Sequence, residues 1–119
     1  MTVRRIVPNH QVTSAQQLET SRDFYALLGF EQVMDMGWVT TMASPTNPTA
    51  QISFFTEERT APVVPDLSVE VEDVDAVYAQ VVASGAEIVR EIRDEDWGVR
   101  RFFTRDPTGR VINVLTHRS

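Results

Sequence analysis

The residues best suited to chemistry lie in the segment Arg93-Asp94-Glu95-Asp96-Trp97-Gly98, where a tryptophan follows three carboxylates. An indole beside carboxylates can hold a flat cationic molecule, because the ring face attracts cations and the carboxylates neutralise them. Trp38, directly after Gly37, is a second candidate for stacking. The structural alternative is that Trp97 anchors its loop and that residues 94–96 are a solvated run of charges. The segment therefore predicts either a binding site or an exposed loop.

Other kinds of reactive site are poorly represented. The chain has no cysteine, which excludes a thiolate nucleophile, a disulfide and Cys-ligated zinc. Of the two histidines, His10 falls on a strand face expected to pack, and His117 lies two residues from the end of the sequence, where fraying is expected. No nucleophile elbow and no phosphate-binding glycine loop is present. The residue types favour ligand binding over covalent catalysis.

Composition sets the class of protein that carries these residues. The chain has 119 residues, of which 42% are hydrophobic, and this is enough for one compact core. Its formal net charge of −6 argues against a nucleic-acid partner. No apolar run reaches the length of a membrane span, and the first residues lack the apolar core of a signal peptide. We expect a single cytoplasmic domain over residues 1–119.

Two similar halves must position the candidate residues. The turn and strand of residues 106–115 (DPTGRVINVL) have a counterpart in residues 47–55 (NPTAQISFF), and the two prolines are 107 − 48 = 59 positions apart. In each half a strand precedes a helix that ends at a glycine, Gly29 or Gly85, and three strands follow. The sequence therefore predicts two βαβββ modules, about 1–59 and about 60–119, joined by a proline-bearing segment.

The expected elements can be given by their residues. The expected strands are 3–12, 31–36, 38–43, 51–56, 67–71, 87–92, 99–103 and 110–115, and the expected helices are 18–28 and 74–83. Asp73 is the expected N-cap of the second helix. The fold class is α+β.

Several short motifs in this order resemble the vicinal oxygen chelate superfamily, the group of glyoxalases, bleomycin-resistance proteins and extradiol dioxygenases. The motifs are Ser21-Arg22-Asp23-Phe24-Tyr25, Leu28-Gly29-Phe30, Trp97-Gly98 and Asp106-Pro107-Thr108-Gly109. The resemblance covers nearly the whole chain. It implies a curved mixed sheet that forms a cup with the helices outside. It also implies a homodimer, because proteins of this fold commonly pair two chains.

The resemblance places the family's metal-ligand positions at Val7, Phe54, Asp66 and Asn113. A divalent ion needs several carboxylates or imidazoles that converge on it. Here Asp66 supplies one carboxylate, Asn113 supplies one neutral carbonyl, and the other two positions supply nothing. The chain is therefore similar to the metal-free bleomycin-resistance-like branch, for which we expect no metal and no cofactor.

Alternation along the strands predicts which side chains line the cup. If Val7 and Asp66 face it, then residues two and four positions further on face it as well. The predicted lining is mixed, with polar groups at Asn9, Gln11, Asp66, Ser68, Glu70 and Asn113 and apolar groups at Ile52, Phe54, Val111 and Leu115. Phe55 is expected under a helix. An open, solvated sheet face would explain the same polar residues.

The sequence predicts a set of ligand-binding residues and no catalytic or metal-binding residue. The set is Trp38, Phe54, Asp66, Ser68, Glu70, Asp96, Trp97, Phe102 and Asn113. Phe102 and Phe103 point to opposite faces, and alternation alone leaves open which of them faces the cup.

The function expected from this set is metal-free sequestration of an aromatic compound, cationic or neutral, such as an antibiotic or a secondary metabolite. One alternative is a lyase, isomerase or oxygenase that uses a divalent metal or an acid–base carboxylate at Asp66 or Glu70. Another is a degenerate module with a filled cup and an oligomeric or regulatory role. The expected partners are a small molecule and a second copy of the chain, with no nucleic acid and no membrane.

Overall fold

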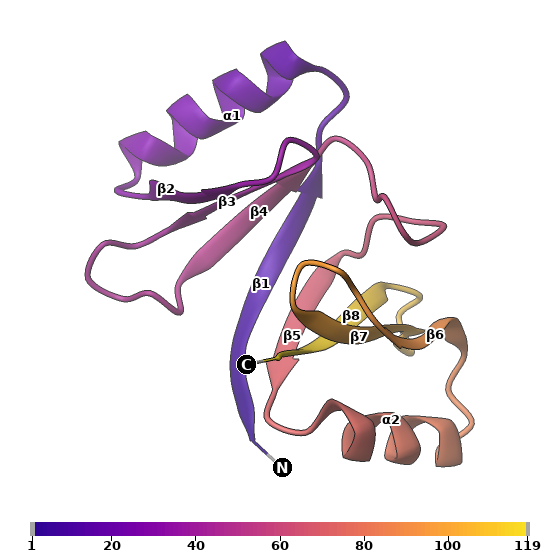
Figure 1. The fold of residues 1–119 in the computed structure, drawn as a ribbon. Helices are drawn as coiled ribbons and strands as arrows, with labels where there is room; N and C mark the ends of the chain where they lie inside the picture. Colours follow the sequence, from indigo (N-terminus) through magenta and orange to yellow (C-terminus); the bar gives the residue numbers. More distant parts are fainter. Residues whose placement is uncertain (1, 119) are drawn as a thin grey trace. The chain divides into compact units, whose positions relative to one another are not determined.

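The computed structural model describes residues 2–118, and the element order βαβββ occurs twice in it (Figure 1). Along the chain the elements are β1 (Val3–Gln11), α1 (Ala15–Leu27), β2 (Glu31–Asp35), β3 (Val39–Ala43), β4 (Gln51–Phe55), β5 (Leu67–Val71), α2 (Val74–Ala83), β6 (Ile88–Asp94), β7 (Val99–Arg105) and β8 (Val111–His117). The predicted α+β class and the two modules are confirmed. None of the helices in the described chain is long and apolar enough to span a membrane.

Hydrogen bonds between strands give the order β2-β3-β4-β1-β5-β8-β7-β6. In each module the first strand pairs with the last in parallel, β1 with β4 and β5 with β8. The pairs β2–β3, β3–β4, β6–β7 and β7–β8 are antiparallel. The sheet is therefore mixed, as predicted. The predicted cup depends on how one module is placed against the other, and it therefore stays a prediction.

The chain forms two compact units, one of residues 7–64 and one of residues 1–6 together with 65–119. The start of β1 thus belongs with module two. Two contacts hold it there: the Glu72 N–H donates to the Thr2 carbonyl at 3.1 Å, and Arg5 Nε lies 2.7 Å from a Glu70 carboxylate oxygen. Within each module the sheet has a helix face, which packs against that module's helix, and an opposite far face.

Both helices begin at a side-chain cap. Ser14 Oγ accepts from the Gln17 N–H at 3.0 Å, and Asp73 Oδ1 accepts from the Ala76 N–H at 3.1 Å. Each cap satisfies an N–H of the first turn that has no partner within the helix. The cap at Asp73 was predicted, whereas α1 begins three residues before the predicted Leu18 because Ser14 stabilises a polar first turn.

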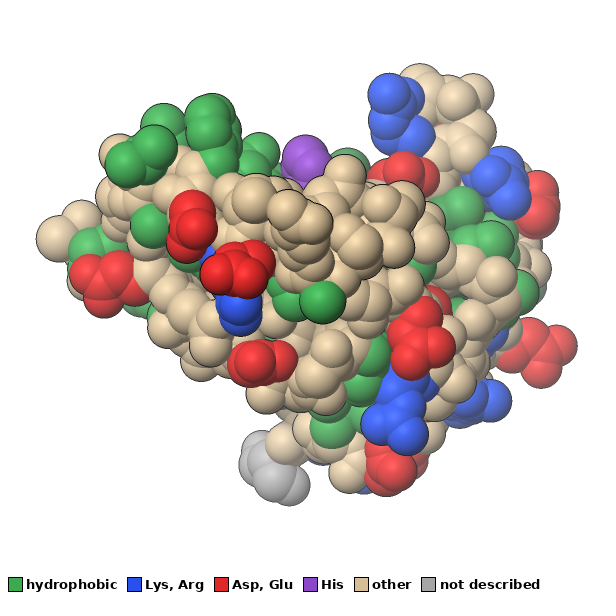
Figure 2. Space-filling model, turned by 90° about the horizontal axis from the view of Figure 1, so that it is seen from above, with side chains coloured by type: hydrophobic (Ala, Val, Ile, Leu, Met, Phe, Trp, Pro, Cys, Tyr) green, Lys and Arg blue, Asp and Glu red, His purple; other side chains and the backbone are tan. Residues whose placement is uncertain are grey.

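The core of each module lies on its helix face. In module one Val12, Met42, Ile52 and Phe54 are buried together, with Leu18, Tyr25 and Phe30 packed against them. Phe24, in contrast, is 56% exposed, because it precedes Tyr25 and so points to another side of the helix. Figure 2, which views the molecule from the side of α1, shows hydrophobic side chains gathered near one end of this helix, where Leu27 and Leu28 are exposed as well.

Equivalent residues in the last strands of the two modules are 60 positions apart in the sequence, not 59. In the parallel pairs, Asn9 lies opposite Ser53 and Ser68 lies opposite Asn113. The first-strand residues are 68 − 9 = 59 apart, but the last-strand residues are 113 − 53 = 60 apart. The extra residue follows the second turn, in which Gly109 has a φ of +89°. One residue more or less in a strand moves every later side chain to the other face.

Candidate functional site

The far face of module two carries a buried polar pair. Ser68 on β5 lies opposite Asn113 on β8, and Asn113 Nδ2 donates to Ser68 Oγ at 3.0 Å. Asn113 is only 6% exposed. Its Oδ1 is also buried, and no residue in the described part of the chain donates a hydrogen bond to it. An acceptor buried without a donor costs free energy, so a ligand N–H or O–H at this oxygen would be stabilising.

Glu70 lies on β5, two positions after Ser68, and is placed between two basic side chains. One carboxylate oxygen is 2.7 Å from Arg5 Nε and the other is 2.8 Å from His117 Nδ1. Burial would raise the pKa of Glu70, but the hydrogen bond with His117 and the charge of Arg5 together hold it below its ordinary value of 4.5. Glu70 is therefore a paired anion.

Sequence reasoning missed His117 as the partner of Glu70. It was expected to fray, but it is the last residue of β8. The signal that could have found it is alternation, since residues 113, 115 and 117 share one face of the strand.

Asp66 has a structural role at the start of β8. Its Oδ2 accepts from the Val111 N–H at 2.9 Å, and its own N–H donates to the Val111 carbonyl at 2.8 Å. The side chain is exposed. The carboxylate predicted as a ligand contact thus fastens β8 to the start of β5.

The ring of Trp97 is already stacked with a cation of the chain. The guanidinium carbon of Arg101 is 5.0 Å from the centroid of the Trp97 ring and 4.9 Å from that of Phe103. Such distances are typical of a cation–π contact. The loop is therefore organised around an internal arginine.

The carboxylates of this loop differ in burial. Glu95 is 4% exposed, and its carboxylate lies 2.7 Å from both Arg90 and Arg101. Burial lowers the pKa of Arg90, and the opposite charge of Glu95 only partly offsets this. Asp94 and Asp96 are exposed. The alternative of a fully solvated run of charges is therefore wrong for Glu95.

Two of the predicted ligand-binding residues lie on helix faces: the predicted facing of Phe54 was wrong, and that of Phe102 had been left open. The Phe54 ring is 5.4 Å from that of Tyr25, and the Phe102 ring is 4.8 Å from that of Tyr78 on α2. For Phe54 the reason is the extra residue after the second turn, which makes Ser53 the counterpart of Asn113. For β7 the residue on the far face is Phe103, which lies opposite Asn113.

The far face of module one has a polar group at the corresponding place. Ser53 lies opposite Thr41, and the two hydroxyl oxygens are 2.6 Å apart. Trp38 is 6% exposed, and its ring is 5.8 Å from that of Phe55. Phe55 was expected under the helix, but it lies two positions after Ser53 on β4 and so shares the far face with it. Sequence reasoning missed Ser53 and Thr41 because it used the wrong offset for β4.

The residues at the implied metal-ligand positions do not fit a divalent ion. With the corrected offset these positions are Val7, Ser53, Asp66 and Asn113. Valine cannot ligate, a serine hydroxyl is a weak ligand, and the Asp66 carboxylate is engaged at the start of β8. Across residues 2–118, no three side chains of His, Cys, Asp or Glu converge in a way that could hold an ion.

Comparison with known proteins identifies the family of this chain. The family model of the glyoxalase/bleomycin resistance protein/dioxygenase superfamily matches residues 8–114. A comparison with curated proteins finds no match. 

Among solved structures, a member of this superfamily from Vibrio splendidus 12B01 is 16% identical with a TM-score of 0.69, over 97% of this chain and 99% of that chain. Methylmalonyl-CoA epimerase from Mycobacterium tuberculosis is 18% identical with a TM-score of 0.65, over 98% of this chain and 88% of that chain. NAD-dependent benzaldehyde dehydrogenase from Legionella pneumophila is 14% identical with a TM-score of 0.72, over 95% and 99%. At these identities the likeness is one of fold.

Proposed function

This chain belongs to the glyoxalase/bleomycin resistance protein/dioxygenase superfamily, and from that premise we propose that it is a metal-free small-molecule-binding protein. The proposed ligand is an aromatic compound, such as an antibiotic or a secondary metabolite, held on the far face of module two. The observation that carries the proposal is the buried Oδ1 of Asn113, which has no donor among residues 2–118.

The chemistry of this face fits a neutral ligand with a hydrogen-bond donor. A carboxamide oxygen accepts from an N–H or O–H but cannot hold a metal ion by itself. Phe103, opposite Asn113 on β7, and Leu115, two positions further on β8, are its buried apolar neighbours on this face. A mainly apolar site with a few fixed polar groups is typical of small-molecule binding.

The expectation of a cationic ligand loses support. A cation bound beside the buried Asn113 needs a carboxylate that is itself at least partly buried and not already paired. Glu70 is paired with Arg5 and His117, and the buried Glu95 is paired with arginines. We therefore propose that the aromatic ligand is neutral.

The enzymatic alternatives also lose support. A general base needs a pKa near the working pH, whereas the pKa of Glu70 is lowered. A metal-dependent reaction needs ligands that the implied positions lack. Superfamily relatives of known structure include an epimerase and a dioxygenase, so the fold by itself is compatible with either class.

The proposal is tested by titrating the protein with neutral aromatic amides and phenols while tryptophan fluorescence is recorded. We expect saturable binding of at least one compound, and an affinity loss of about tenfold in Asn113→Ala, which removes the acceptor. Thr116→Ala is the matched control, because it removes a hydroxyl from the same strand that bonds instead to the Val71 carbonyl. Equal affinities in wild type and Asn113→Ala, or no binding by any compound, would contradict the proposal.

A further inference from the structure

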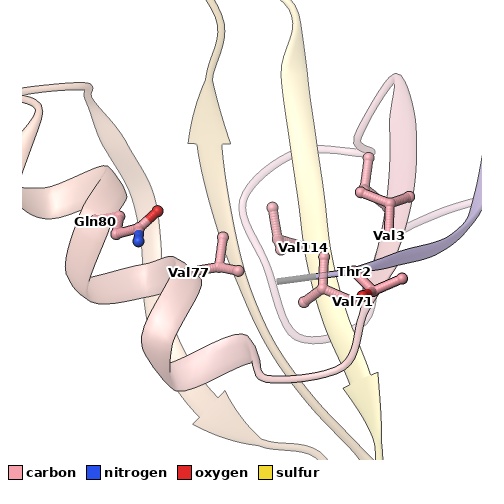
Figure 3. A pocket seen from close by; sticks show the side chains of 7 residues that line it. Thr2, Val3, Val71, Val77, Gln80 and Val114 are labelled. Atoms are coloured by element: carbon pink, nitrogen blue, oxygen red, sulfur yellow. The ribbon is translucent and has the colours of Figure 1, made fainter.

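A pocket of about 420 Å³ opens on the helix face of module two (Figure 3). Asn113 lies on the other face of the sheet, because it is adjacent to the pocket residue Val114 on β8. Val71 and Val114 on the strands are buried, and Val77 and Gln80 project from α2 toward them. Thr2, Val3 and Val69 complete the lining, in which no residue is charged. The pocket lies within one compact unit of the chain.

The same place in module one is filled by aromatic rings. There His10 lies opposite Phe54 in the parallel pair, just as Val69 lies opposite Val114 in module two. The ring centroids of His10 and Phe54 are 5.9 Å apart, and that of Tyr25 is 5.4 Å from Phe54. Module two has valines where module one has rings, and these short side chains leave the space open.

The two helices also differ in a way that leaves this space open in module two. The N-caps Ser14 and Asp73 are 59 residues apart, so Tyr25 of α1 corresponds to position 25 + 59 = 84, which is Ser84. Ser84 is already the C-cap of α2, whose 10 residues are fewer than the 13 of α1. The shorter helix ends before it can supply a side chain at the position of Tyr25. The pocket therefore has two causes in the sequence: small residues on the strands and an early helix end.

We propose that this pocket is a binding site for a small, neutral, apolar molecule with one ring. Such a molecule takes the place that the rings of His10, Tyr25 and Phe54 fill in module one. An apolar cavity of about 150 Å³ is already large enough to bind benzene, so the volume here is sufficient. The uncharged lining excludes an ionic ligand, because a charge moved there would lose its hydration without gaining a partner.

The rim of the pocket limits the substituents that the ring can carry. Thr2 and Gln80 are exposed, and within residues 2–118 no hydrogen bond involves their side-chain polar atoms. A hydroxyl or carbonyl on the ring can therefore bond to them at the solvent edge while the ring contacts the valines. This site does not depend on the function proposed for the far face.

Toluene is a suitable probe, and its binding can be followed by NMR of valine methyl groups. We expect saturable shifts at Val69, Val71, Val77 and Val114, and an affinity at least tenfold weaker in Val114→Phe, which copies Phe54 of module one. Val77→Leu, which copies Leu18, is a second and milder filling variant. Glu31→Gln, at an exposed position of β2 in module one, is the control and should bind toluene as the wild type does.

Three results would overturn the proposal. The first is a set of shifts that does not saturate or that spreads over both faces of the sheet. The second is wild-type affinity for toluene in both Val114→Phe and Val77→Leu. The third is an affinity that falls as the protein concentration rises, because the pocket would then be covered by a second copy of the chain.

Discussion

At the scale of single residues, Glu95 is the buried carboxylate at the centre of a group of ion pairs. Its carboxylate is nearly inaccessible and accepts from Arg90 and Arg101, both of which are buried as well. Removing one partner of a buried pair leaves the other charge without compensation, at a cost of about 3–5 kcal/mol. We therefore expect Glu95→Gln to lower the free energy of unfolding by about that amount.

Urea denaturation of the wild type and Glu95→Gln measures this loss. Asp94→Asn is the matched control, because Asp94 directly precedes Glu95 at the end of β6 but its side chain is 52% exposed where it pairs with Arg100. Exposed pairs contribute about 0–1 kcal/mol, so the control should stay close to the wild type. Equal losses in the two variants would show that the buried ion pairs of Glu95 contribute no more to stability than an exposed pair does.

Glu70 makes the stability depend on pH. Its pKa in the folded protein is lowered, so its contribution is present above the unfolded pKa and is lost as the pH falls through the folded value. The stability difference between the wild type and Glu70→Gln should therefore be largest near neutral pH and shrink in acid, in denaturation curves recorded from pH 7 down to about pH 3.

Glu72→Gln is the control for this pH dependence. Glu72 lies next to the same strand, but its ion pair with Arg4 is long, at 3.9 Å, and exposed. Its difference from the wild type should stay small throughout the titration. A Glu70→Gln difference that is constant with pH would mean that the pairing with Arg5 and His117 does not lower the pKa of Glu70.

At the scale of elements, Gly109 determines how β8 enters the sheet. Its φ of +89° lies in the left-handed region, and a Cβ built on it would meet no atom within 4 Å. The cost of a side chain there is therefore one of backbone conformation, about 1–2 kcal/mol for alanine. We expect Gly109→Ala to lose that much stability in thermal or urea unfolding, and Gly109→Asn to lose less, since asparagine tolerates this region better. Wild-type stability in Gly109→Ala would contradict the turn geometry.

The same turn explains how far the sequence predicts the structure. The element order and the cap at Asp73 follow from local patterns, and the faces of β5 and β8 follow from alternation, so Ser68, Glu70 and Asn113 were placed on one face correctly. Alternation along a strand gives the face of a residue only relative to a reference residue. Because module two has one additional residue after Gly109, the face assigned to Phe54 and to the rest of β4 was the wrong one. 

Other features could not be read from local sequence. Two adjacent phenylalanines on β7 give no indication of which one meets a helix, and Phe102 is the one that does. The burial of Glu95 depends on cross-strand contacts with arginines, which a run of charges in the sequence does not show.

At the scale of the whole molecule, a second copy of the chain stays a proposed partner, on the basis of the family resemblance. Light scattering should then give about twice the chain mass of 13.5 kDa. A mass of one chain at working concentration would contradict the dimer while leaving both proposed binding sites open to test.

The metal-free binding proposed for this superfamily member can be tested directly. Its most direct test is the metal content of protein purified without chelator and without an affinity metal, measured by elemental mass spectrometry. We expect far less than one equivalent of any transition metal per chain, because Val7, Ser53, Asp66 and Asn113 do not make a ligand set. Near one equivalent of bound metal would contradict the account, and the protein should then be assayed as a metalloenzyme.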